Sequence, residues 1–295
     1  MTSKLIAIIS FILVLNKVAF AGQGADSLSL EQKPTYATET FLSTRIINGH
    51  SVETIRKKQL DFRISHRFGQ MNEGIDQFYG LDHGTIHLSL EYGIKNWLEI
   101  GIGRSTFEKT VDGYLIATIF RQSSGIKNMP VHITYLASSE WITLKSSPAS
   151  RYEFFGSRLS YIQQLLIARK FNGKFSMQLA PTFIHRNQVP TVLDKNDLYA
   201  VGGGARYKIT KWVAVTTEYF WVYRPNANAL LTKYYNPLSI GVDIDTGGGH
   251  VFQIMLTNSQ AMREGGFIGK TTGTWKDSGI HLGFNISRLF SLSRD

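Results

Sequence analysis

The stretch from Leu198 to Tyr223 decides the fold and reads LYAVGGGARYKITKWVAVTTEYFWVY. On its second arm, residues 213, 215, 217, 219 and 221 fall on one face and residues 214, 216 and 218 on the other. This period of two is typical of a β-strand that lies between two different solvents. The arms meet at Thr210 and Lys211, and each has about 11 residues, the length that a tilted strand needs to cross the hydrocarbon layer. The stretch therefore predicts a membrane-spanning β-hairpin.

The same alternation recurs from Leu60 to Phe290 in about twelve segments, joined alternately by short turns and longer loops. This pattern predicts an all-β fold over residues 60–295: an antiparallel transmembrane β-barrel of about 12 strands with short periplasmic turns and longer outer loops. An even number of strands puts both ends of the barrel in the periplasm. A soluble β-sandwich is the alternative, but it gives no reason for tryptophan at both ends of the outward faces. The predicted membrane-interface aromatic residues are Trp97, Trp212, Trp221 and Phe290.

The first residues indicate export. An apolar run over residues 5–15 follows a lysine, and Ala19-Phe20-Ala21 ends the segment with the small-x-small pattern that signal peptidases cut. Residues 1–21 are therefore predicted to be a signal peptide and residues 22–39 a flexible periplasmic lead-in. The predicted location is the cell outer membrane.

The composition limits the classes of partner that we expect for the protein. The chain has no cysteine, so neither disulfides nor a lipid-modified cysteine can hold the exported protein, and anchorage must come from the fold. The formal net charge of +10 comes from scattered basic residues, and we expect no nucleic-acid partner for an exported protein. The expected partners are outer-membrane lipids, lipopolysaccharide and the barrel insertion machinery, for which the last strand leads to Phe290 near the carboxyl terminus. Small solutes are possible partners as well.

Several phrases of the sequence resemble an uncharacterised family of Gram-negative outer-membrane β-barrels, known as a domain of unknown function. These phrases are TRIINGHSVET from Thr44, LDFRISHRFG from Leu60, YGLDHG from Tyr79, LLIARKF from Leu165 and APTFIHRN from Ala180. The similarity covers nearly all of residues 40–290. It implies the barrel and brings no reaction or ligand with it.

The predicted inward faces of the strands carry charged and ionisable side chains. These are Arg63, Arg67, His87, Glu91, Glu99, Arg206, Lys208, Glu218, Asp243 and His281. In lipid each charge would cost several kcal/mol, whereas facing water or one another they are tolerated. A barrel of this size, about 23 Å across, leaves room for a narrow channel or can be closed by side chains. We therefore expect a channel or passive transporter for small hydrophilic solutes, with a closed structural or complex-forming barrel as the alternative.

No catalytic constellation, metal site or cofactor motif emerges from the sequence, and no pair among the eight histidines has the spacing of a zinc site. An outer-membrane lipid hydrolase is the second alternative. Its candidates are Ser259 with His66 or His185, near the outer ends of strands, but no nucleophile motif surrounds them. We therefore expect no enzymatic activity and no cofactor.

Residues 40–59 precede the first strand and contain Phe41, Leu42, Ile46 and Ile47, which is too apolar for a solvated tail. Glycine weakens a strand unless the chain bends or another backbone approaches closely. The inward parity carries such glycines at Gly101, Gly103, Gly202, Gly204, Gly241 and Gly283. These glycines either relieve crowding and permit curvature or make room for an insert. Our hypothesis is that residues 40–59 form a lumen plug, with Arg45 and His50 meeting inward carboxylates such as Glu99 or Glu218.

Overall fold

The computed structural model describes residues 33–144, 154–189, 191, 193–225, 230 and 232–292. The described residues from Pro34 onward form one compact unit. The predicted signal peptide, residues 1–21, and most of the predicted lead-in, residues 22–39, lie outside the described residues.

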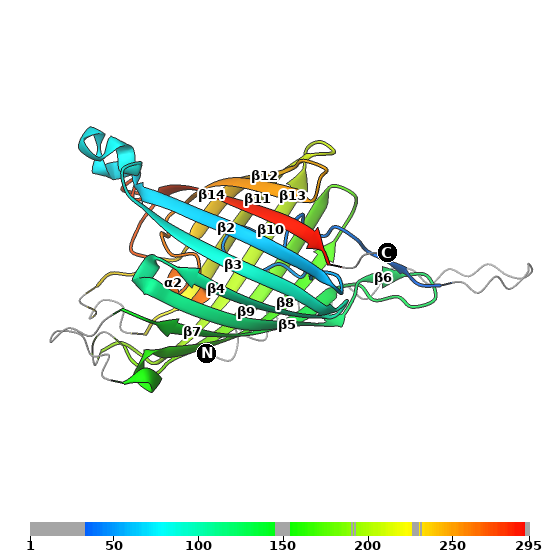
Figure 1. Ribbon diagram of the computed structural model, residues 1–295, viewed down its shortest axis with the longest axis horizontal. Coiled ribbons are helices and arrows are strands. Elements are labelled where there is room, and N and C mark those ends of the chain that lie inside the picture. Colours follow the sequence, from blue (N-terminus) through cyan, green and yellow to red (C-terminus); the bar gives the residue numbers. More distant parts are fainter. Residues whose placement is uncertain are drawn as a thin grey trace, which may run out of the picture. The chain divides into compact units, whose positions relative to one another are not determined.

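Twelve strands of this unit close into an antiparallel barrel (Figure 1), which confirms the predicted all-β fold. They are β2 (Gln59–Gln70), β3 (Gly84–Lys95), β4 (Leu98–Ser105), β5 (Thr110–Phe120), β7 (His132–Ile142), β8 (Leu159–Lys170), β9 (Phe175–Arg186), β10 (Asp197–Lys208), β11 (Val213–Tyr223), β12 (Leu238–Asp245), β13 (His250–Thr257) and β14 (His281–Ser291). Each strand pairs with its neighbours along the chain, and β14 pairs with β2 to close the barrel. Closure leaves no unpaired edge, as a membrane-spanning sheet requires.

The remaining elements are short. Strand β1 (Thr35–Tyr36) pairs with β6 (Ser123–Ser124) in a separate two-stranded sheet. The helical turns are η2 (Met71–Glu73), η3 (Ile75–Gly80), η4 (Phe107–Lys109), η5 (Phe155–Arg158) and α2 (Glu264–Phe267). Within the described ranges, no helix has the length and apolar character needed to cross a membrane.

The hairpin formed by β10 and β11 shows how the sequence sets the faces of the barrel. Its register runs from Tyr199 opposite Tyr223 to Lys208 opposite Ala214. Glu218 is 3% exposed and Trp221 is 52% exposed, so successive residues face either the interior or the surroundings. The exposed parity is apolar on the other strands too, as at Leu90 and Ile102. This surface is the one that a lipid environment requires.

We call the end of the barrel with the connections at residues 96–97, 171–174, 209–212 and 246–249 the turn end, and the opposite end the loop end. Trp97 and Trp212 are exposed beside turns of the turn end, and Phe290 lies near the same end in β14. Trp221 lies in the half of β11 that leads to the loop end. Aromatic residues thus lie toward both ends of the apolar surface.

The predicted strict alternation of short turns and long loops is wrong at two places around β5. At the loop end β4 and β5 are joined by residues 106–109 only, and at the turn end β5 and β7 are joined by the longer residues 121–131. The longer connection contains β6, which pairs with β1. Its additional length therefore gives the chain that enters the barrel from β1 a backbone partner at the turn end.

Candidate functional site

The site is built around residues 40–55, which we call the inserted segment. Its backbone is held by carboxylates that point inward from the strands. Glu218 on β11 accepts hydrogen bonds from the amide nitrogens of Ile47 and Asn48, each at 3.3 Å, and of Gly49 at 2.9 Å. Across the barrel, Glu99 on β4 accepts one from the amide of Ile55 at 2.7 Å. The segment therefore lies in the lumen, between strands from different parts of the wall.

The apolar residues of the inserted segment are buried. Phe41, Ile46, Ile47 and Val52 are at most 3% exposed and pack in one cluster with apolar residues of the wall. Cδ1 of Ile46 lies 2.4 Å from the place that a Cβ atom would take at Gly204, so a side chain at this position of the wall would displace the end of the Ile46 side chain. A hydrophobic contact and the hydrogen bonds thus position the same turn of the segment.

The other inward glycines have different neighbours. A Cβ atom added at Gly101 would meet the Tyr114 ring, and one at Gly202 would meet the Phe220 ring. At Gly103 it would meet His87 and Asp112, and at Gly283 it would meet Arg67. At Gly241 it would meet Met255 and the carbonyl of Ile254. These glycines relieve crowding within the wall itself. Gly93, which the sequence did not single out, is closer to the predicted role, since its Cβ would lie 2.1 Å from the carbonyl oxygen of Arg56. Of the six predicted glycines, Gly204 is therefore the one that lies against the inserted segment.

Arg45 does not meet Glu99 or Glu218, as the sequence suggested, but Glu91 on β3, with Nη2 and Oε1 3.1 Å apart. Glu91 also accepts hydrogen bonds from the hydroxyls of Thr44 at 2.7 Å and Tyr114 at 2.6 Å. Glu99 and Glu218 accept backbone amides of the segment, whereas Glu91 accepts the hydroxyl of Thr44, the residue next to Arg45. The guanidinium group pairs with this third carboxylate.

A second part of the chain, for which the sequence patterns predict no role, also enters the lumen. Residues 258–273 of the connection between β13 and β14, which we call the inserted loop, include the short helix α2. Arg263 forms an ion pair with Asp112 on β5 at 3.2 Å, and the amide of Gly265 donates to Glu140 on β7 at 2.9 Å. The sequence signal was present in the apolar pair Phe267 and Ile268, both fully buried, inside an otherwise polar loop.

The inserted segment and the inserted loop meet at His50 and Glu264, whose Nδ1 and Oε1 atoms are 2.7 Å apart. His50 therefore has a partner on the inserted loop and not Glu99 or Glu218, the wall carboxylates suggested from the sequence. The guanidinium groups of Arg45 and Arg263 each lie 5.3 Å from the centre of the Tyr114 ring. Tyr114 thus contacts a cation from each insert, which links both to β5.

The protonation of this contact follows from its burial. Burial, together with the positive charge of Arg45, lowers the pKa of His50 to about 4. Burial alone would raise the pKa of Glu264, but the positive charge of Arg263 and the hydrogen bond from His50 hold it well below its usual value. At neutral pH the imidazole is therefore uncharged and donates its Nδ1 proton to an ionised carboxylate.

The remaining predicted lumen residues point inward as well and have partners of their own. Among the arginines, Arg63 donates to Asp61 at 3.0 Å, Arg67 to Asn48 at 2.8 Å and Arg206 to the carbonyl of Glu39 at 3.0 Å. His87 forms a pair with Asp112 at 2.8 Å, and Asp243 accepts a hydrogen bond from Gln253 at 2.9 Å. His281 forms a hydrogen bond with the carbonyl of Phe68 at 2.8 Å. Lys208 is half-buried and lies 3.8 Å from Glu39. Several of these partners belong to the inserted segment or to the chain just before it.

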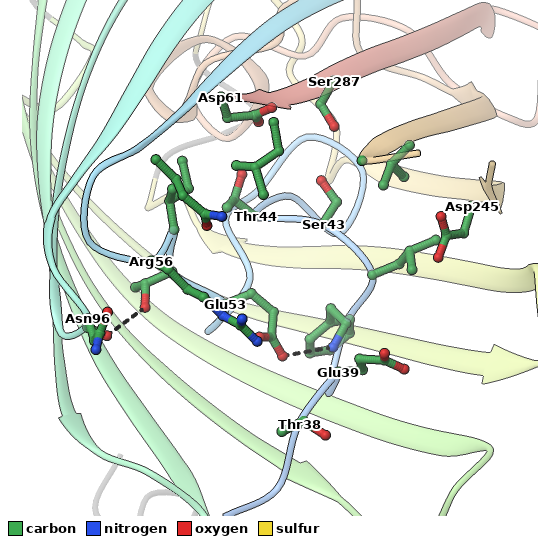
Figure 2. Close-up of a pocket in the computed structure, with 18 of the residues that line it drawn as sticks. Thr38, Glu39, Ser43, Thr44, Glu53, Arg56, Asp61, Asn96, Asp245 and Ser287 are labelled. Carbon is green, nitrogen blue, oxygen red and sulfur yellow. Dashed lines mark hydrogen bonds between the residues drawn. The ribbon is translucent and has the colours of Figure 1, made fainter. Parts of the chain in front are cut away.

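A cavity of about 900 Å³ lies between the inserted segment and the wall at the turn end. Figure 2 shows Glu39, Ser43, Thr44 and Glu53 lining it from the N-terminal stretch, with Asp245 opposite on the wall. Toward the loop end, two further cavities hold only about 20 Å³ each. The lumen is thus roomy on the turn side of the inserted segment and tightly packed near the inserted loop.

The arrangement expected for a lipid hydrolase is not found at Ser259. Its side chain is buried, and its hydroxyl donates to the carbonyl of Ala261 at 3.3 Å. His185 instead pairs with Asp197 at 2.6 Å on the exposed surface, and His66 stacks on the Phe284 ring. Within the described ranges, no group of three or more histidine and acidic side chains is arranged to hold a metal ion.

The chain is similar in fold to several solved structures. The chain is similar to the NanC porin, with 10% identity over 78% of this chain and 98% of that chain and a TM-score of 0.48. It is also similar to Omp33 of Acinetobacter baumannii (8% identity, 79% and 99%, TM-score 0.43) and to outer membrane phospholipase A of Escherichia coli (9% identity, 84% and 98%, TM-score 0.42). No curated protein matches the chain.

Structural similarities of this size carry no information on activity. The family model described as "Membrane bound beta barrel domain (DUF5777)", by contrast, matches residues 41–290, which include the inserted segment, the inserted loop and nearly the whole barrel. This protein therefore belongs to the DUF5777 family of membrane-bound β-barrels.

Proposed function

We propose that the protein is a channel or passive transporter for small hydrophilic solutes in the outer membrane, and that the inserted segment closes its lumen. The observation that carries this proposal is the polar wall behind the segment, where Glu91, Glu99 and Glu218 are used as hydrogen-bond acceptors. A barrel closed permanently gains most from an apolar core, because buried charges must be compensated. A charged wall loses little when the segment leaves, since water then hydrates the carboxylates.

The proposed membrane placement follows from the surface of the barrel. The exposed apolar residues and Trp97, Trp212, Trp221 and Phe290 would contact outer-membrane lipids and lipopolysaccharide. The turn end, where the chain enters β2 and leaves β14, would face the periplasm. The signal peptide, residues 1–21, would be removed, and the insertion machinery would recognise the last strand.

A closed structural or complex-forming barrel is the second candidate. It is favoured by the buried pairs Arg45 with Glu91 and His50 with Glu264, which fill the middle of the lumen. Conduction separates the two candidates, because a structural barrel keeps its inserts in place.

The test uses two neighbouring glycines of β10 in the full chain. Gly204→Leu would push directly on Ile46, whereas a Cβ atom at Gly203 meets nothing within 4 Å and Gly203→Leu only adds an apolar group. Overpacking costs roughly 1–3 kcal/mol, which shifts the population of the displaced segment about 5- to 150-fold. In planar lipid bilayers, Gly204→Leu should therefore raise the ratio of open to closed time by that factor, and Gly203→Leu should behave as the natural protein.

Folding of both variants is checked by the migration of the unheated barrel on gels. A folded Gly204→Leu barrel that shows no more conductance than Gly203→Leu would contradict the channel and favour the structural barrel.

A further inference from the structure

The inserted segment donates hydrogen bonds to three wall carboxylates, and it also accepts hydrogen bonds from wall side chains such as Arg67 and Asn285. Glu91 receives the Arg45 guanidinium and the Thr44 hydroxyl, and Glu99 receives the amide of Ile55. Glu218 receives three successive backbone amides. All three carboxylates are at most 3% exposed. The segment thus places a positive charge or the positive ends of N–H and O–H dipoles on each of them.

One carboxylate is only partly satisfied. Oε2 of Glu99 accepts the hydrogen bond from Ile55, but Oε1 is buried and has no hydrogen-bond partner in the described part of the chain. A buried carboxylate oxygen without a donor is costly. A cation or a hydrated cation at this position would therefore satisfy the Glu99 carboxylate better than the inserted segment does.

The buried charged residues of the barrel wall are also predominantly negative. Among the described strand residues that are buried, seven are carboxylates, namely Asp61, Glu91, Glu99, Asp112, Glu140, Glu218 and Asp243, and four are arginines, namely Arg63, Arg67, Arg186 and Arg206. Two half-buried lysines, Lys170 and Lys208, lie at the turn end, where Lys208 pairs with Glu39. The inserted segment contributes Arg45 and Glu53, and the inserted loop contributes the ion-paired Arg263 and Glu264, so the inserts largely balance their own charges. The excess of negative charge therefore belongs to the wall and remains when the inserted segment leaves.

We propose that the opened lumen passes cations in preference to anions, with Glu91, Glu99 and Glu218 as the residues that determine this selectivity. This inference rests on the proposed channel function. The inserted segment occupies, with its own donors, the places where cations interact with the wall during passage. A wall lined by one sign of charge concentrates counter-ions, and low-dielectric surroundings strengthen the effect.

The experiment measures reversal potentials of the full-length Gly204→Leu protein in planar bilayers with a gradient of potassium chloride. We expect potassium to be about tenfold more permeant than chloride, the lower end of electrostatic focusing in a charged cleft. Glu91→Gln, Glu99→Gln and Glu218→Gln, each added to Gly204→Leu, should each lower this ratio, and the three together should bring it close to one. Asp82→Asn, in an exposed loop outside the barrel lumen, is the matched control and should leave it unchanged.

The outcomes distinguish the two proposals. No conductance from the folded protein would overturn the channel itself and the cation preference with it. Conductance with equal permeability, with chloride preferred, or with a cation preference that survives the triple substitution would overturn the role of the three carboxylates and leave the channel standing.

Discussion

The wall of the barrel and the inserted segment are held by different kinds of bonds. In β10 and β11, backbone groups pair without interruption from Tyr199 opposite Tyr223 to Lys208 opposite Ala214. In the inserted segment, one tight turn pairs Arg45 with His50, and wall side chains such as Glu218, Glu99 and Asn285 provide the polar contacts to the wall. The wall can therefore keep its backbone bonds without the segment, whereas the segment depends on the wall. Substitutions that act on one region should leave the other largely intact.

The largest effect on the inserted segment alone is expected for Arg45→Met. Removing one partner of a buried ion pair costs about 3–5 kcal/mol, and Glu91 keeps the hydroxyls of Thr44 and Tyr114, so we expect the lower part of this range. Hydrogen exchange of residues 46–51 should accelerate, while exchange in the strands and the unfolding of the barrel should change little. Arg56→Met is the control, because Arg56 is exposed in the same N-terminal stretch. Equal exchange in the two variants would show that the ion pair does not hold the segment.

The converse substitution, Leu90→Arg, acts on the wall. Leu90 lies midway along β3 on the outward face and is 45% exposed. Arginine near the middle of the membrane costs about 2–4 kcal/mol in a β-barrel. Urea unfolding in lipid vesicles, followed by tryptophan fluorescence, should show this loss for Leu90→Arg and not for Leu90→Val. A midpoint shared by the two variants would contradict the assignment of this face to lipid.

A smaller effect is expected from pH at the contact between the inserts. The pKa of His50 is about 4 when the inserted segment is docked in the lumen and near 6.5 when the segment is displaced. Between these pH values the displaced segment therefore binds a proton that the docked segment does not. The contribution of His50 to docking is therefore complete above pH 6.5 and declines as the pH falls toward 4. Arg45, Arg263, Glu264 and Tyr114 are the groups that face the ring.

Channel opening should accordingly rise between pH 6.5 and 4 more steeply in the natural protein than in His50→Gln, which cannot take up this proton. Identical pH profiles of conductance in the two proteins would show that His50 plays no part in docking.

The fold was predictable because alternation is a local signal. Residues such as Glu218 and Trp221 reveal the face on which they lie through their immediate neighbours, so strand number, closure and the inward charges follow from the sequence. The partners inside the lumen have no such signal. Arg45 pairs with Glu91 and not with the wall carboxylates Glu99 or Glu218, and His50 meets Glu264, which is distant in sequence and belongs to a loop without periodicity. Contacts of this kind depend on the path that the segment takes through the lumen, which no local pattern specifies.

The proposed channel requires that the inserted segment closes the lumen and leaves it reversibly. The most direct measurement introduces Ile46→Cys and Gly204→Cys together into the full chain, which has no cysteine of its own. The Ile46 side chain touches Gly204, so the pair is placed to form a disulfide, whereas Ile46→Cys with Gly203→Cys, on the opposite face of β10, is not. In planar bilayers, the oxidised Cys pair should be silent, and reduction should restore conductance steps without changing the folded barrel. Equal conductance before and after reduction of a fully cross-linked protein would contradict the claim.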